Sequence, residues 1–218
     1  MIVEIFVASF IGGLLSLDVS AWGQIMVCRP IVCGPLIGLL LGDLKTGLII
    51  GVLLELIWIN VISVGAAIPP DATIVAVTCT TLIMLTERML PLGNNFQGSY
   101  RMVVLALTMP LGEIFTRIDI KQRKLNAHFV HYLDREIPKG NLKALGKVNY
   151  FSLFLFFLKG FLFSLIAISA GVYFLPKLFS CLPYGVLTGL NFAYRLIPAL
   201  GLAIAFNTFR GFRYRFPD

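Results

Sequence analysis

Acidic side chains stand inside a stretch of the sequence that is otherwise almost wholly apolar, residues 29–71. Glu55 lies within an apolar run that starts at Gly47, where an ionised carboxylate costs several kcal/mol unless a partner compensates its charge. Asp71 follows Pro69 and Pro70, so it stands at a break where a helix does not continue. Such carboxylates, together with prolines and clustered glycines in membrane-length segments, are typical of a transport path.

The histidines and cysteines form no pattern typical of catalysis or metal binding. His128 and His131 are three residues apart, but no cysteine or acidic pair is arranged to complete a site, so we interpret them as surface residues. The cysteines match no metal motif and are expected to be buried small apolar residues: Cys28, Cys33, Cys79 and Cys181. A Walker-type phosphate loop is absent from the sequence. We therefore expect no catalytic residue, no metal and no cofactor on this chain.

The composition indicates an integral membrane protein. The 218 residues are 58% hydrophobic and 13% charged, whereas a soluble domain has about 25% charged residues. The net charge of +7 does not indicate nucleic-acid binding, because the basic residues cluster in the way expected of cytoplasmic loops. Eight of the 18 lysines and arginines lie in 117–147, and three lie in 210–215.

The segments that must position Glu55 and Asp71 are short or interrupted. Residues 30–42 are too few to span about 30 Å of hydrocarbon as a helix. Interruptions are also expected in 47–68, at Asn60 and the glycine-alanine run, and in 103–115, at Pro110. Broken helices are tolerated at membrane depth where protein buries them or where they line a cavity.

Small residues recur at four-residue spacing on both sides of a turn expected at residues 43–45. This spacing places a bare stripe on one helix face and lets two backbones approach closely. The glycines concerned are Gly34, Gly38, Gly42, Gly47 and Gly51.

The chain divides into three parts: a membrane half over 1–116, a basic segment over 117–149, and C-terminal membrane segments with a basic tail over 150–218. Apolar residues at three- and four-residue steps predict an amphipathic helix near 121–136 in the basic segment, which we place in the cytoplasm. The last part contains spans over 150–175, where Lys159 is the only charge, and over 185–209, with a turn at 176–184 between them.

The string "RPIVCGPLIGLLLGDLKTGLIIGVLLELIW" followed by "VGAAIPPD" closely resembles the IIC membrane component of the mannose/fructose/sorbose family of the bacterial phosphoenolpyruvate-dependent sugar phosphotransferase system. The upstream pattern "GGLLSLD…WGQ…CRP" is similar to the N-terminal part of the same family, and two later strings resemble its later segments: "GNLKALGKVNYFSLFL" and "GVLTGLNFAYRLIPALGLAIAFN". The similarity covers nearly all of the chain.

The resemblance implies an all-helical, multi-span membrane protein of the bacterial cytoplasmic membrane, with broken or re-entrant helices, inverted repeats and an elevator-like movement of the substrate. It further implies a IID membrane subunit as partner, an oligomer of such pairs, and cytoplasmic IIA and IIB components that phosphorylate the sugar. Mannose, fructose, sorbose and amino sugars all remain open as substrates. Relatives usually continue beyond the equivalent of Asn207, which leaves a regulatory, sensory or assembly role as the alternative to efficient transport.

A sugar presents hydroxyl groups, so its site needs carboxylates and amides. The residues expected to contact it are Glu55, Asp71, Gln24 and Asn60, followed by Asp18 and Asn191. Two alternatives stay open from the sequence. Glu55 is alternatively the structural ion-pair partner of Arg29 or Lys45, and Asp71 is alternatively the N-cap of the helix that follows it.

Overall fold

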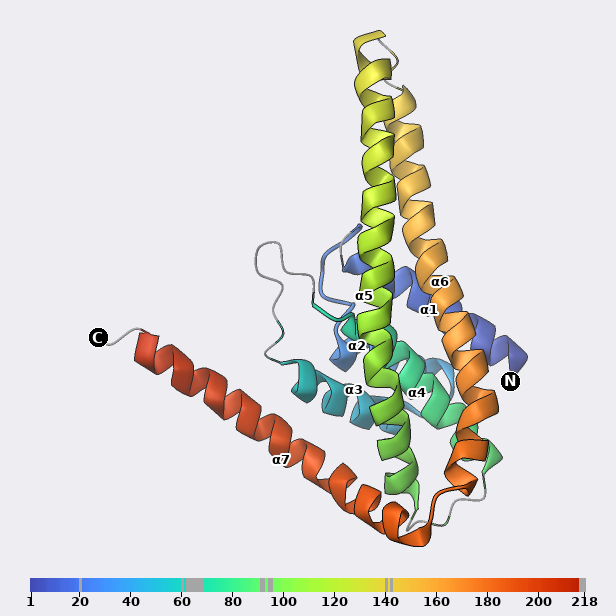
Figure 1. Ribbon diagram of the computed structural model, residues 1–218, viewed down its shortest axis with the longest axis vertical. Helices are drawn as coiled ribbons and strands as arrows, with labels where there is room; N and C mark the ends of the chain where they lie inside the picture. Colours follow the sequence, from blue (N-terminus) through green and yellow to red (C-terminus); the bar gives the residue numbers. More distant parts are fainter. Residues whose placement is uncertain are drawn as a thin grey trace.

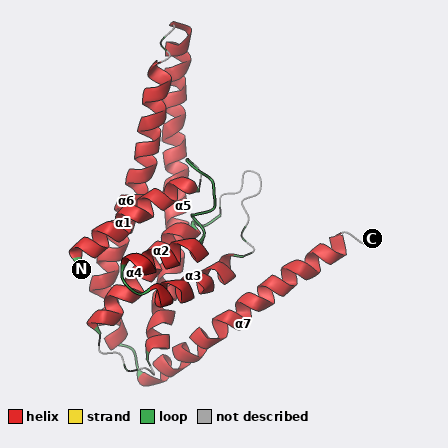
Figure 2. Ribbon diagram, turned by 180° about the vertical axis from the view of Figure 1, so that it is seen from behind, coloured by secondary structure: helices red, strands yellow, loops and turns green. Residues whose placement is uncertain are grey.

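The described part of the computed structural model is built from helices, and it contains no strand (Figure 2). It comprises residues 1–19, 21–59, 61, 69–90, 93, 96–139, 141 and 143–215, with side chains described as far as residue 207. The elements are α1 (Ile2–Asp18), α2 (Pro30–Leu40), α3 (Leu44–Trp58), α4 (Ala72–Met89), α5 (Gln97–Glu136), the 3₁₀ helix η1 (Ile137–Lys139), α6 (Lys143–Ser180) and α7 (Tyr184–Arg215). The expected all-α membrane fold is confirmed.

Helices α5 and α6 form a long antiparallel pair that extends well beyond the other helices (Figure 1). They contain 40 and 38 residues, so each is about 60 Å long at 1.5 Å per residue, roughly twice the hydrocarbon thickness of a bilayer. Helix α7 leaves the far end of α6 and runs obliquely away from the pair (Figure 1). Within the described residues, three helical stretches are long and apolar enough to cross a membrane: Ala72–Met89, Lys143–Ser180 and Tyr184–Asn207.

Helix α4 is the centre of the helical cluster. It contacts α1, α2, α3, α5 and α6, and every residue from Thr73 to Thr86 is buried. Two of its hydroxyls, on Thr81 and Thr86, donate to the carbonyl oxygens of Val77 and Leu82 one turn earlier, which satisfies them inside the apolar surroundings. The helices that position the acidic residues therefore pack around one apolar helix.

Helices α2 and α3 form a hairpin of two half-length helices. With 11 and 15 residues they are about 17 and 23 Å long, so neither spans a bilayer alone. The predicted close approach is confirmed for four of the five glycines: a Cβ on Gly34 would lie 2.6 Å from the carbonyl oxygen of Gly47, and one on Gly47 would lie 2.7 Å from the Cα of Gly38. Gly42 is the exception, because it follows the end of α2 with φ of +82° and nothing lies within 4 Å of an added Cβ. The turn between the helices ends where the Asp43 carboxylate accepts from the backbone N–H of Thr46 at 3.0 Å.

Some expected helix boundaries are wrong. Helix α5 runs unbroken through Pro110 and through residue 117, and α6 runs through Pro176, so the predicted amphipathic helix is the end of α5 and the predicted turn shortens to residues 181–183. A proline removes one main-chain hydrogen bond, and packing of α5 on α4, α6 and α7 outweighs that local loss. The predicted segment 47–68 ends as a helix at Trp58, and the glycine-alanine run lies outside the described residues.

Candidate functional site

Asp18 organises the loop that joins α1 to α2. Its Oδ1 accepts from the backbone N–H of Ile25 at 2.9 Å, and its Oδ2 accepts from the backbone N–H of Cys28 at 3.1 Å. The side chain is buried at the end of α1. Gly23, with φ of +88°, leaves the space that Asp18 Oδ1 occupies, because a Cβ there would lie 2.9 Å from that oxygen.

Glu55 lies one turn before the end of α3 and binds Arg29, the residue just before α2. Arg29 Nε donates to Glu55 Oε1 at 2.8 Å, and a second guanidinium nitrogen donates to the same oxygen. Glu55 Oε2 accepts a longer bond, 3.3 Å, from the backbone N–H of Ile31 in the first turn of α2. The carboxylate thus faces both an arginine and the positive end of a helix dipole.

Asp71 caps α4. Its Oδ1 accepts from the backbone N–H of Ile74 at 3.0 Å, which is the N-cap that one of the two sequence interpretations expected. Its own N–H donates to Thr116 Oγ1 of α5 at 3.1 Å. Thr73, in the first turn of α4, donates its hydroxyl to the carbonyl oxygen of Cys28 at 3.0 Å, which ties this helix end to the α1–α2 loop.

The dipeptide Cys28–Arg29 bonds to Asp18, to Glu55 and to the first turn of α4, the helix that Asp71 caps. Cys28 bonds to Asp18 through its N–H and to the first turn of α4 through its carbonyl oxygen, while Arg29 pairs with Glu55. The end of α1, the start of α2, the last turn of α3 and the start of α4 therefore meet at one level, beside the middle of α5 (Figure 1). We call Asp18, Glu55 and Asp71 the carboxylate cluster; its oxygens suit a neutral ligand rich in hydroxyl groups.

The structure describes two of the three remaining predicted contact residues, Gln24 and Asn191. Gln24 is exposed on the α1–α2 loop with φ of +52°. Asn191 of α7 lies against Gly98 in the first turn of α5, about 27 Å along that helix from Thr116. Asn60 lies outside the described residues.

A buried ion pair near the cluster was not among the predicted site residues. Lys159 of α6 donates to Asp119 Oδ1 of α5, and Arg123 Nε donates to Asp119 Oδ2 at 2.7 Å. The Lys159 ammonium also lies 4.5 Å from the ring centroid of Phe115. The sequence did offer a signal, since a lone lysine in a predicted span requires a counter-ion.

The structure also places the histidines and cysteines considered in the sequence analysis. His131 is exposed, with Nδ1 3.7 Å from Asp134 Oδ2, and the described residues contain no cluster of histidine, cysteine and acidic side chains suited to a metal ion. Cys33 and Cys79 are buried as expected, whereas Cys181 is exposed because it lies in the turn between α6 and α7.

Comparison with known proteins assigns a family to this architecture. Residues 2–212 match the family model described as the PTS system sorbose-specific IIC component. The chain belongs to this family. It is 30% identical to the mannose-specific EIIC component of Escherichia coli K12 over 210 residues, which are 96% of this chain and 73% of that relative. It is 25% identical to the sorbose-specific EIIC component of Klebsiella pneumoniae, over 99% of this chain and 76% of that one.

Solved structures agree with the IIC assignment. One described as a membrane protein matches with a TM-score of 0.74 and 28% identity, over 99% of this chain and 82% of its own. Another, the mannose transporter ManYZ in complex with microcin E492, matches with a TM-score of 0.63 and 29% identity, over 96% of this chain and 79% of its own. The chain is thus a sugar-specific IIC component of the phosphotransferase system and a membrane protein.

Proposed function

We propose that this IIC component binds a hexose-type sugar at the carboxylate cluster and conducts it across the bacterial cytoplasmic membrane, where a IIB partner phosphorylates it. The observation that best supports this proposal is that the Cys28–Arg29 dipeptide bonds to Asp18, to Glu55 and to the first turn of α4, which Asp71 caps. Four helix ends supply polar groups at that level, among largely apolar helices.

Glu55 is the main sugar contact in this proposal. Its Oε1 receives both bonds from Arg29, whereas Oε2 receives one long bond from Ile31 N–H, so Oε2 retains acceptor capacity for a sugar hydroxyl. Arg29 holds the carboxylate in place and compensates its charge when the site is empty of sugar. Asp71 combines its capping role with a second acceptor, and Asp18 shapes the loop that covers the site.

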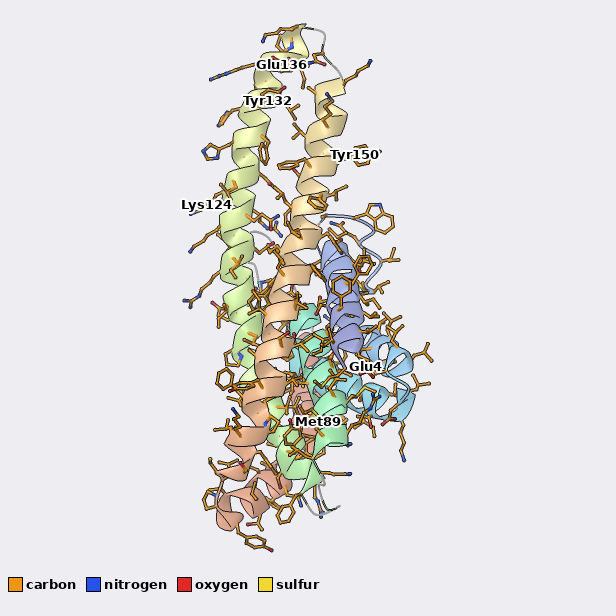
Figure 3. The ribbon with its side chains drawn as sticks, turned by 90° about the vertical axis from the view of Figure 1, so that its right-hand side faces the viewer. Glu4, Met89, Lys124, Tyr132, Glu136 and Tyr150 are labelled. Carbon is orange, nitrogen blue, oxygen red and sulfur yellow. The ribbon has the colours of Figure 1, made fainter. Side chains whose placement is uncertain are left out.

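The partner subunits that we propose are inferred from proteins to which this chain is similar. We propose a IID subunit against the exposed apolar faces of the membrane helices, in an oligomer of such pairs, because the similar ManYZ structure is a mannose transporter. The tip of the α5–α6 pair, residues 124–150, is proposed to lie in the cytoplasm with the IIA and IIB components. Figure 3 labels four side chains of this extension: Lys124, Tyr132, Glu136 and Tyr150. They lie well apart from Glu4 of α1 and Met89 of α4, which belong to the packed helices below.

The decisive experiment is mannose binding and uptake by the chain assembled with a IID subunit, comparing wild type with Glu55→Gln. We expect Glu55→Gln to lose binding sharply while the complex stays inserted, because a neutral amide accepts more weakly and no longer pairs with Arg29. Glu113→Gln is the matched control, since Glu113 is an exposed α5 residue paired with Arg117. Unchanged affinity in Glu55→Gln would remove Glu55 from the site, and binding without uptake in wild type would favour the regulatory alternative.

A further inference from the structure

Polar residues continue along one face of α5 beyond the carboxylate cluster. Asp119, Gln122 and Asn126 follow Thr116 at steps of three, three and four residues, so they share one side of the helix. Thr116, Asp119 and Gln122 are each at least nine-tenths buried, and Asn126 is half-buried. This α5 polar face starts at the Asp71 cap, which Thr116 contacts, and runs toward the tip of the α5–α6 pair.

Gln122 is the unusual member of this face. Both its amide nitrogen and its amide oxygen are buried, and neither has a hydrogen-bond partner in the described structure; the same holds for the amide oxygen of Asn126. Buried amides are nearly always bonded, and an ordered water or a bound polar molecule would supply the missing partners. Together they offer one NH₂ group, with two donors, and two acceptor oxygens within about one helical turn.

The neighbours of these amides select the ligand. On one side the Asp119 carboxylate binds both Lys159 and Arg123, so these two cations are already paired and an anion would face a carboxylate. About one turn beyond Asn126, the ring of Phe129 packs edge to face on that of Phe151, with centroids 5.5 Å apart, within the usual range of about 4.5–7 Å. A neutral hydroxyl-bearing molecule suits this interval, whereas a sugar phosphate does not.

We propose that Gln122 and Asn126 form a second sugar-binding station that receives the unphosphorylated sugar after it leaves the carboxylate cluster. Gln122 lies about 9 Å and Asn126 about 15 Å along α5 from Thr116, in the direction of the tip. The inference rests on the proposed function and adds to it a place in the sequence of events: the station is occupied between release from Glu55 and phosphoryl transfer. The amides bind by hydrogen bonds alone, which permits onward release.

The test compares Gln122→Leu and Asn126→Leu with wild type in the assembled complex. A titration with mannose without IIB present reports both the carboxylate cluster and the station, and the initial rate of mannose uptake with IIA and IIB present reports the whole path. We expect two binding events in wild type, loss of the weaker one in each leucine variant, and an uptake rate lower by about tenfold, the effect of losing one well-placed hydrogen bond. Gln122→Asn keeps an amide and should recover part of the rate.

Ser164→Ala is the matched control, because Ser164 of α6 also has a buried hydroxyl without a partner but lies against Gly12, off the α5 polar face. Wild-type uptake in both leucine variants would overturn the station and leave the amides as hydrated structural groups. An equal loss of affinity and rate would overturn it too, by placing Gln122 in the first site. Failure of wild type itself to bind mannose would instead count against the proposed function.

Discussion

Arg29 and Glu55, 26 residues apart in the chain, form an ion pair in which Arg29 Nε lies 2.8 Å from Glu55 Oε1. The pair links the first residue before α2 to the last turn of α3, so it closes the open end of the glycine-packed hairpin. The side chain of Glu55 is 16% exposed and that of Arg29 is 33% exposed. A structural pair and a ligand site are therefore compatible, because one carboxylate oxygen is held and the other is accessible to a hydroxyl.

Removing one member of this pair should destabilise the hairpin more than removing both. Arg29→Gln leaves the Glu55 charge without its partner, which costs about 3–5 kcal/mol when such a pair is buried and less at the partial exposure seen here. The double variant Arg29→Gln/Glu55→Gln should recover most of the thermal stability of the purified protein. It should not recover mannose binding.

The control for this cycle is Arg117→Gln/Glu113→Gln, an exposed pair on α5 whose loss should change the melting temperature little. If Arg29→Gln and the double variant melted at the same temperature, the ion pair would contribute nothing measurable to the hairpin. If the double variant bound mannose as wild type does, neither residue would belong to the sugar site.

Substitution of Asp71 should separate its capping role from its role toward sugar. Asn caps helices as well as Asp does, so Asp71→Asn should keep the stability of α4, whereas Asp71→Ala should lose about 1 kcal/mol. Both variants remove the charge, so both should weaken mannose binding if Asp71 contacts sugar. Thermal melts and equilibrium binding on the two purified variants supply the comparison. Wild-type affinity in Asp71→Asn would leave Asp71 with the cap alone.

The sequence was sufficient to predict the residues that have a strong local reason to be where they are. Glu55 in an apolar run needed a partner, and Asp71 after two prolines was suited to an N-cap; both features are present in the structure. The short hairpin helices and their glycine contact also follow from spacing alone. Each of these inferences depends on residues within about thirty positions of one another.

Contacts between distant helices were not predictable in the same way. Asp119 lies in a basic segment that suggested a solvated helix, and its pairing with Lys159, 40 residues later, depends on how α5 and α6 align. The placement of Asn191 beside Gly98 depends on the direction that α7 takes after the turn. Helix continuity through Pro110 likewise results from packing with other helices, which overrides local preference.

The glycine contact in the α2–α3 hairpin should not tolerate a side chain. In Gly34→Ala the new Cβ would lie 2.6 Å from both the carbonyl oxygen of Gly47 and the Cα of Gly51, and backbone atoms cannot move aside as a flexible side chain does. We expect a loss of about 1–3 kcal/mol in stability and reduced sugar binding, because the hairpin positions Glu55. Gly146→Ala is the control, since nothing lies within 4 Å of the added Cβ. Equal melting temperatures for the two variants would contradict this packing.

The orientation of the α5–α6 tip should be measurable with single cysteines at opposite ends of the α5–α6 pair. Cys181 is exposed at the end of α6, and His131, 79% exposed, lies near the tip on α5. Because α6 is about 57 Å long, we expect the two positions to lie on opposite sides of the bilayer. If the tip is cytoplasmic, a membrane-impermeant maleimide should label Cys181 on intact cells.

In a Cys181→Ser background, the same reagent should label His131→Cys only after the cells are permeabilised. The Cys181→Ser protein without the new cysteine supplies the background signal, because the other thiols are buried or half-buried. Labelling of His131→Cys on intact cells would reverse the topology. It would also place the basic residues of 117–147 outside the cell, against the clustering of positive charge on the cytoplasmic side.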